Sequence, residues 1–189
     1  MNDVATAQIH RKLVGFPPVL GRSPRIMVLG SMPGVESLNK RQYYGHPRNQ
    51  FWKILYILLR RKTSDHYEDK KRMLMNNHIA VWDVVHSCRR NGSLDSNLKD
   101  VKTNDFKYFF EEHSTLRAVF FNGQTAYKLF KRHNDDITLP AIVLPSTSPA
   151  YTLFFGKKLI QWRKILEFIQ TGDPSSCGPL PVGETHSSG

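Results

Sequence analysis

Long hydrophobic runs are missing from this sequence of 189 residues. It contains no stretch of about 18 consecutive apolar residues, the length that a membrane-spanning helix needs. Residues 1–20 also lack the uninterrupted apolar core of a secretory signal peptide. We therefore expect a cytoplasmic protein without a membrane anchor.

Cysteine is scarce, because the chain contains only Cys88 and Cys177. The two match no zinc-binding spacing, and no His-x-x-x-His or Cys-x-x-Cys pair occurs. The His-x-Glu and Pro-Cys-x-x-Cys pattern of zinc base deaminases and the Gly-x-Ser-x-Gly elbow of serine hydrolases are missing as well. These absences argue against a zinc enzyme and favour a reduced, intracellular protein that needs no metal.

Positive charge, in contrast, is in excess. The chain has 27 Lys and Arg against 16 Asp and Glu, which gives a net charge of +11 and an isoelectric point near 9.8. Lys and Arg bind phosphate backbones and release their counterions, so this charge favours an anionic partner. Solubility alone is the other explanation.

Four short apolar runs recur along the chain, with the β-branched and aromatic content of buried parallel strands. Between and after them, apolar residues recur at spacings of three to four, as in amphipathic helices. This alternation predicts one α/β domain over residues 1–170, a three-layer α/β/α sandwich with a mainly parallel central sheet of about four strands. The apolar runs span residues 25–30, 79–85, 117–122 and 141–145.

The last segment, residues 171–189, is rich in Pro, Gly and Ser and has almost no large apolar side chain. Such a composition buries too little apolar surface to offset the entropy that ordering costs. We therefore expect a disordered C-terminal tail after the domain.

Polar loops follow each apolar run. Ligands of open α/β sheets bind beyond the carboxyl ends of the strands, so these loops predict the functional site. Each loop also has a structural alternative, because GSMPG could be only a tight turn and the hydroxyls of PSTSPA could cap the next helix. The loops are GSMPG and YYGHPRN after the first run, HSCRRNGSLDSN after the second, NGQT after the third and PSTSPA after the fourth.

Taken in order, the segments VLGSMPG, YYGHPRNQFW, FNGQTAY and LPSTSPAY resemble the uracil-DNA glycosylase superfamily. More narrowly, they resemble its hypoxanthine-DNA (deoxyinosine) glycosylase branch, which is similar to the mismatch-specific uracil/thymine-DNA glycosylases. The resemblance spans residues 16 to 169. It implies a monofunctional, monomeric enzyme that flips a damaged nucleotide out of double-stranded DNA and hydrolyses its N-glycosidic bond without a cofactor. The four-cysteine iron–sulfur cluster of some relatives is excluded, because this chain has two cysteines.

The resemblance also implies roles for single residues around the base. Ser31 stands where mismatch-specific relatives have a catalytic Asn and uracil-specific ones an acid, so the catalytic amide maps onto Asn49 of HPRN. An amide can position water, and backbone N–H groups of residues 31–34 can stabilise the departing base. For Asn49 the alternative is capping of the following helix. The residues expected to contact the base are Ser31, Met32, Tyr44 and His46, with Tyr44 stacking on it.

Contacts with DNA are implied for a second set of residues. Relatives press the loop after their last strand into the minor groove and pinch phosphates with it. Asp95 could shape the pocket, although no role is assigned to it, and Tyr43 is expected to pack in the core. The DNA-contacting set is Arg48, Pro145, Ser146, Thr147, Ser148 and Pro149.

The expected substrate is hypoxanthine, the deamination product of adenine, in double-stranded DNA. Three alternatives stay open: a uracil or mismatch glycosylase, a catalytically inactive DNA-binding module of the same fold, and a hydrolase of free nucleosides. A DNA-repair role predicts association with the nucleoid if the cell is prokaryotic.

Overall fold

The computed structural model describes residues 12–134 and 138–170. Its centre is a four-stranded parallel sheet with the strand order β3-β2-β6-β7. This confirms the predicted α/β class and the four predicted strands. The expected tail, residues 171–189, lies outside the described residues. The strands are β2 (Ile26–Gly30), β3 (Ile79–Asp83), β6 (Ala118–Asn122) and β7 (Ala141–Leu144).

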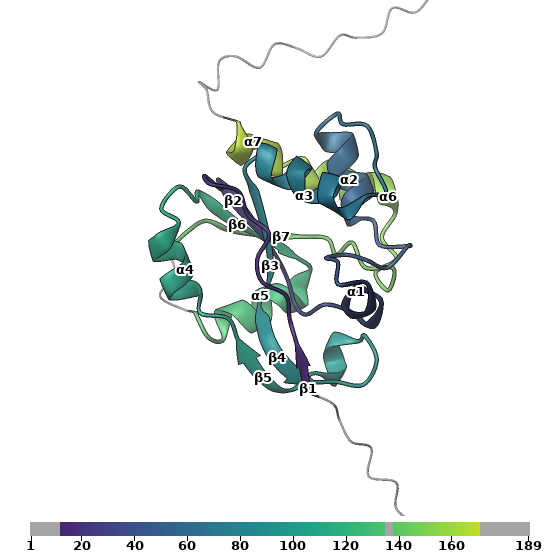
Figure 1. Ribbon diagram of the computed structural model, residues 1–189, viewed down its shortest axis with the longest axis vertical. Coiled ribbons are helices and arrows are strands. Elements are labelled where there is room, and N and C mark those ends of the chain that lie inside the picture. The colour runs from purple at the N-terminus through teal and green to yellow at the C-terminus, as the bar shows by residue number, and fades with distance from the viewer. Residues whose placement is uncertain (1–11, 135–137, 171–189) are drawn as a thin grey trace, which may run out of the picture.

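Helices cover both faces of this sheet (Figure 1). Successive strand residues point to opposite faces, so Ile26 and Val28 pack against α2, α3, α6 and α7, whereas Met27 and Leu29 pack against α4 and α5. The three predicted layers are therefore present. The first group of helices is α2 (Phe51–Leu58), α3 (Tyr67–Asn76), α6 (Phe155–Trp162) and α7 (Ile165–Ile169), and the second is α4 (Phe106–Glu112) and α5 (Gln124–Lys131).

A second, three-stranded antiparallel sheet was not predicted. It has the order β1-β4-β5, with β1 (Lys12–Val14), β4 (Val85–Arg89) and β5 (Lys99–Thr103). Residues 85–89, expected to end a strand and begin a loop, form its middle strand. The chain leaves β3 here but stays bonded to the turn after β2, because Val84 N–H donates to the Gly30 carbonyl at 2.8 Å and Val85 N–H to the Ser31 carbonyl at 2.9 Å.

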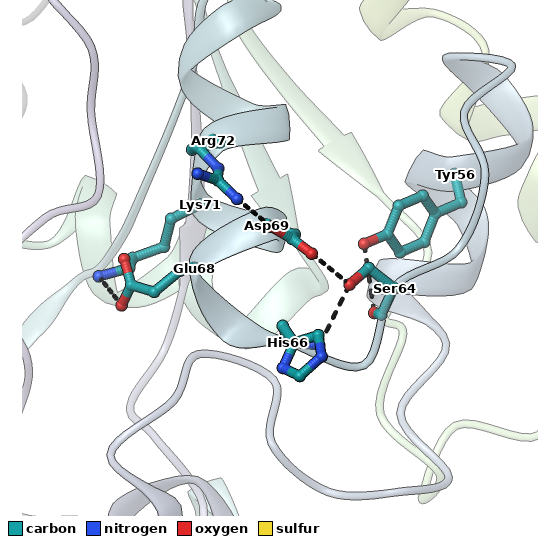
Figure 2. Close-up of polar contacts among 7 residues, drawn as sticks. All are labelled: Tyr56, Ser64, His66, Glu68, Asp69, Lys71 and Arg72. Carbon is teal, nitrogen blue, oxygen red and sulfur yellow. Dashed lines mark hydrogen bonds and ion pairs between the residues drawn. The ribbon is translucent and has the colours of Figure 1, made fainter.

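Polar contacts of Ser64 join the end of α2 to the start of α3 (Figure 2). The Ser64 hydroxyl donates to Asp69 Oδ2 at 2.7 Å and accepts from His66 N–H at 3.2 Å. Tyr56 Oη donates to the Ser64 carbonyl at 3.3 Å, and Asp69 also pairs with Arg72. The bonds from Ser64 and Arg72 lower the pKa of Asp69.

In the described part of the chain, every helix is too short or too polar to cross a bilayer.

Candidate active site

A cavity of about 170 Å³ opens beyond the carboxyl ends of the parallel strands. Its lining comes from the last residues of β3 and β6, from the segment between β2 and α2, and from the loops after β4 and β7. The side chains that the resemblance assigned to the base and to catalysis thus line one cavity. The predicted residues that line it are Ser31, Met32, Tyr44, His46, Asn49, Ser146, Ser148 and Pro149.

The Tyr44 ring forms one wall of this cavity. It stacks on Phe51, the first residue of α2, with 3.7 Å between ring centroids and 23° between the planes. Its φ angle of 54° lies in the left-handed region, which is uncommon for a residue with a bulky side chain. Burial raises the pKa of the Tyr44 phenol, which stays neutral, and the nearby Asp83 charge raises it further. Tyr43 is instead a core residue, as predicted, and donates to the Phe16 carbonyl at 3.2 Å.

Asn49 lies where the segment after Tyr44 enters α2. Its side-chain oxygen accepts from Phe51 N–H at 3.0 Å, so the helix-capping alternative corresponds to a real contact. An amide oxygen accepts two hydrogen bonds, however, and the amide group still donates. The bond from Phe51 therefore fixes the orientation of the amide beside the cavity and leaves capacity for a water molecule.

Two neighbours in the same segment differ in their surroundings. His46 Nδ1 accepts from Arg48 N–H at 3.1 Å, which leaves Nε2 as the protonated ring nitrogen that can donate. The Arg48 side chain is exposed and does not line the cavity. His46 therefore lines the cavity, whereas the exposed Arg48 side chain lies outside it.

The loop after β7 is arranged differently from the prediction at Thr147. This side chain is fully buried, and Asn122 holds it through two bonds of 2.8 Å, from Asn122 Nδ2 to the hydroxyl and from Thr147 N–H to Asn122 Oδ1. Pro145 is buried as well, and its carbonyl accepts from Trp162 Nε1 at 2.9 Å. Thr147 and Pro145 thus support the loop from inside, whereas Ser146, Ser148 and Pro149 line the cavity.

The two loops that flank the cavity are joined directly. Gln50 N–H, at the start of α2, donates to the Thr147 carbonyl at 3.0 Å. The segment that carries Tyr44 and Asn49 and the loop after β7 are therefore parts of one connected rim.

Ser31 and Asp95 form a hydrogen-bonded pair at the cavity. The Ser31 hydroxyl donates to Asp95 Oδ2 at 2.7 Å, which supplies the contact that the sequence could not assign to Asp95. Burial raises the pKa of Asp95, while the Ser31 hydrogen bond and the Arg90 charge oppose the shift. Arg90 is itself buried and donates to the Pro33 carbonyl. This bond holds the GSMPG turn in place.

Five polar residues that line the cavity were not selected from the sequence, namely Glu36, Ser37, Asp83, Ser93 and Asn122. Ser93 accepts from Val35 N–H at 2.9 Å and holds the start of α1 (Val35–Lys40). Asn122 and Asp83 are the last residues of β6 and β3. For Asn122 the available signal was a polar residue ending an apolar run, a position at the ligand-binding edge of a parallel sheet.

Asp83 is the most perturbed acid of the site. Burial, with a smaller contribution from the negative Asp95, raises its pKa to about 7 against the opposing effect of Arg90. Strongly shifted acids in a cavity are typical of functional sites.

Among the described residues, no group of three or more His, Cys, Asp or Glu side chains could hold a metal ion.

Comparisons with known proteins match this architecture. The family model of the uracil DNA glycosylase superfamily matches residues 17–170. A protein of Methanosarcina acetivorans named hypoxanthine DNA glycosylase is 37% identical over 154 residues, which are 80% of this chain and 96% of that protein. One of the same name from Methanosarcina barkeri is 39% identical over 114 residues, 60% of this chain and 72% of that protein. A solution NMR structure of a candidate uracil DNA glycosylase from Methanosarcina acetivorans superposes with a TM-score of 0.72 at 35% identity, covering 84% of this chain and 99% of that one.

Proposed function

This chain belongs to the uracil DNA glycosylase superfamily, and we propose that it is a monofunctional DNA-repair glycosylase that removes hypoxanthine from double-stranded DNA. The reaction hydrolyses the N-glycosidic bond of deoxyinosine and leaves an abasic site. The two Methanosarcina relatives that are named hypoxanthine DNA glycosylase support this choice of base. The enzyme acts as a monomer in the cytoplasm, on the nucleoid if the cell is prokaryotic.

The observation that carries the proposal is the meeting of Tyr44 and Asn49 at one cavity. A base inside a duplex cannot reach this cavity, so the target nucleotide has to rotate out of the stack. Tyr44, backed by Phe51, offers the flipped base a flat and rigid surface for stacking. Asn49 stands at the same cavity, where its amide can hold a water molecule against the sugar.

The chemical step needs a placed water and a stabilised leaving group, but no strong base. As the bond between C1′ and N9 breaks, the sugar gains oxocarbenium character and the purine gains negative charge. The Asn49 amide oxygen orients the water that attacks C1′. Hydrogen-bond donors around the cavity, among them backbone N–H groups of residues 31–34 and His46 Nε2, stabilise the purine. No lysine takes part, so the products are the free base and an unbroken abasic strand.

The DNA strand follows a wider groove of about 720 Å³ that continues from the cavity. His46, Ser146, Ser148 and Pro149 line both spaces, so they mark the passage through which the flipped nucleotide enters. Serine hydroxyls at this passage suit phosphate oxygens. The net charge of +11 provides the attraction for the strand at longer range.

The test is a single-turnover excision assay on duplexes that carry one deoxyinosine, one deoxyuridine or one G·T mismatch, followed by alkaline cleavage of the abasic product. We expect fastest excision from the deoxyinosine duplex. Faster release of uracil or thymine would move the enzyme to the uracil or mismatch class. Salt-dependent DNA binding without an abasic product would leave only a binding module. Faster cleavage of free inosine than of DNA would identify a nucleoside hydrolase.

A further inference from the structure

Asp83 occupies space that exists only because Gly30 has no side chain. The two residues are register partners at the carboxyl ends of β3 and β2. A Cβ atom on Gly30 would lie 2.3 Å from Asp83 Oδ1 and 3.5 Å from Tyr44 Oη. The carboxyl group thus reaches over the β2 backbone to the cavity, next to the proposed stacking ring. With 4% of its surface exposed, Asp83 is almost closed to solvent.

The Asp83 carboxyl group lacks the partner that burial normally requires. In the described residues, Asp83 Oδ2 has no hydrogen-bond partner. Buried polar atoms without partners are rare, because each one loses its bonds to water and gains none in return. Such an atom beside a cavity indicates that a ligand with polar edges completes the site.

The surroundings of Asp83 favour its protonated form. Burial and, to a smaller extent, the negative Asp95 carboxyl raise the pKa of this carboxyl, the Arg90 guanidinium lowers it, and the net value is about 7. The protonated acid is therefore well populated at neutral pH, and unlike a carboxylate it donates a hydrogen bond. The titratable groups that act on Asp83 or respond to its charge are Asp95, Arg90, Tyr43, Tyr44 and Tyr67.

We propose that Asp83 is a further catalytic residue, whose protonated carboxyl donates a hydrogen bond to the acceptor edge of the flipped purine and stabilises the charge that this base gains. The inference rests on the proposed function. The electron pair of the bond between C1′ and N9 stays with the purine, and the water oxygen forms the new bond to C1′. The proton that the water loses neutralises the released base, so Asp83 keeps its own proton throughout.

Hydrogen-bond donation from Asp83 also suits hypoxanthine better than adenine. A 6-oxo purine carries acceptors at O6 and N7 on one edge, whereas adenine has a donating amino group in place of O6. A donor aimed at this edge stabilises the deaminated base and opposes the undamaged one. A carboxylate at the same point would repel the departing anion.

The deciding experiment measures single-turnover excision of hypoxanthine from about pH 5 to about pH 9 for the wild type, Asp83→Asn and Asp83→Ala. Because the protonated acid is the active form, the wild-type rate should fall about tenfold per pH unit above roughly pH 7. Asparagine donates without titrating, so Asp83→Asn should stay within about tenfold of the wild type at pH 6 and lose the decline. Asp83→Ala should lose roughly 100- to 1,000-fold.

Glu68→Gln is the matched control, because Glu68 is an exposed acid on α3 that pairs with Lys71 at 2.7 Å and does not line the cavity (Figure 2). This variant also removes one carboxylate and should keep the wild-type pH profile. Binding to an undamaged duplex and thermal unfolding should show that both Asp83 variants are folded.

The inference is overturned if Asp83→Asn declines with pH as the wild type does, or if Asp83→Ala is as fast as the wild type at pH 6. If neither variant folds, the wild-type profile decides, and a rate that stays constant up to about pH 9 rejects the role of Asp83. A wild-type enzyme that releases no hypoxanthine at any pH would instead reject the proposed function itself.

Discussion

The ring of Tyr44 lies almost parallel to the ring of Phe51, with 3.7 Å between their centroids. Phe51 is fully buried in the core, so it holds Tyr44 as a fixed wall of the cavity. Replacing Tyr44 by Ala should weaken the binding of a deoxyinosine duplex by roughly 5- to 150-fold, the loss expected for one base–aromatic stack. Tyr44→Phe retains the ring and should bind within a few-fold of the wild type. Fluorescence anisotropy measures the affinity of each protein for the duplex. Equal affinities of the wild type and both variants would show that Tyr44 does not stack on the base.

Asn49 combines a structural contact with its proposed catalytic role, and substitution can separate the two. Asn49→Ala should lower single-turnover excision by roughly 100- to 1,000-fold. It should also cost about 1 kcal/mol of unfolding free energy, since Phe51 N–H loses its acceptor. Asn49→Ser keeps a capping oxygen but has no amide. We expect this variant to recover the stability without recovering the rate, and recovery of both would reduce Asn49 to a helix cap.

Asn122 should affect DNA binding through the loop after β7. Its two bonds of 2.8 Å hold the buried Thr147, so Asn122→Ala should leave two polar groups without partners. We expect a loss of about 1–3 kcal/mol of unfolding free energy and weaker binding of undamaged DNA. Asn122→Asp keeps the acceptor for Thr147 N–H and should bind DNA more tightly than the Ala variant at high salt. Unchanged affinity in both would show that this loop does not carry the DNA contacts.

The close approach of Asp83 to Gly30 can be tested by a double-mutant cycle. Gly30→Ala places a Cβ atom 2.3 Å from Asp83 Oδ1, so the acid has to move out of the cavity. This overpacking should cost roughly 1–3 kcal/mol of unfolding free energy. In an Asp83→Ala background this clash is absent, and the contact with Tyr44 Oη at 3.5 Å is an ordinary one, so the same change should cost much less. Additive losses in chemical denaturation would contradict the contact.

The pH dependence of stability gives an independent measure of Asp83. Its pKa is raised to about 7 in the folded protein, whereas the unfolded chain has the ordinary carboxyl value. Between these two values the folded state binds more protons than the unfolded state, so this acid lowers stability as the pH rises. Asn at position 83 does not titrate. The melting temperature of Asp83→Asn, relative to that of the wild type, should therefore increase as the pH rises from about 5 to about 8. A constant difference across this range would mean that Asp83 titrates normally.

The sequence predicted the parallel sheet well because each of its strands is a local apolar run. It failed for the antiparallel sheet because KLV and KDVKT have little apolar pattern, and KLV also pairs with β4 across a long stretch of chain. The same failure hid Asp83, since residues 79–85 read as one continuous run although β3 ends at this acid. Tyr44 and Asn49 were selected through the resemblance and both line the cavity, whereas the burial of Thr147 depends on Asn122, a partner that no local pattern identifies.

The bond from Gln50 N–H to the Thr147 carbonyl has a consequence for engineering. Because it fastens the entrance of α2 to the loop after β7, neither segment is an independent module. A chimera that takes HPRN from a relative but keeps PSTSPA would disturb the contact between these two segments. The reverse exchange would disturb it in the same way. Transplanting a new base preference into this scaffold therefore requires both segments to be exchanged together.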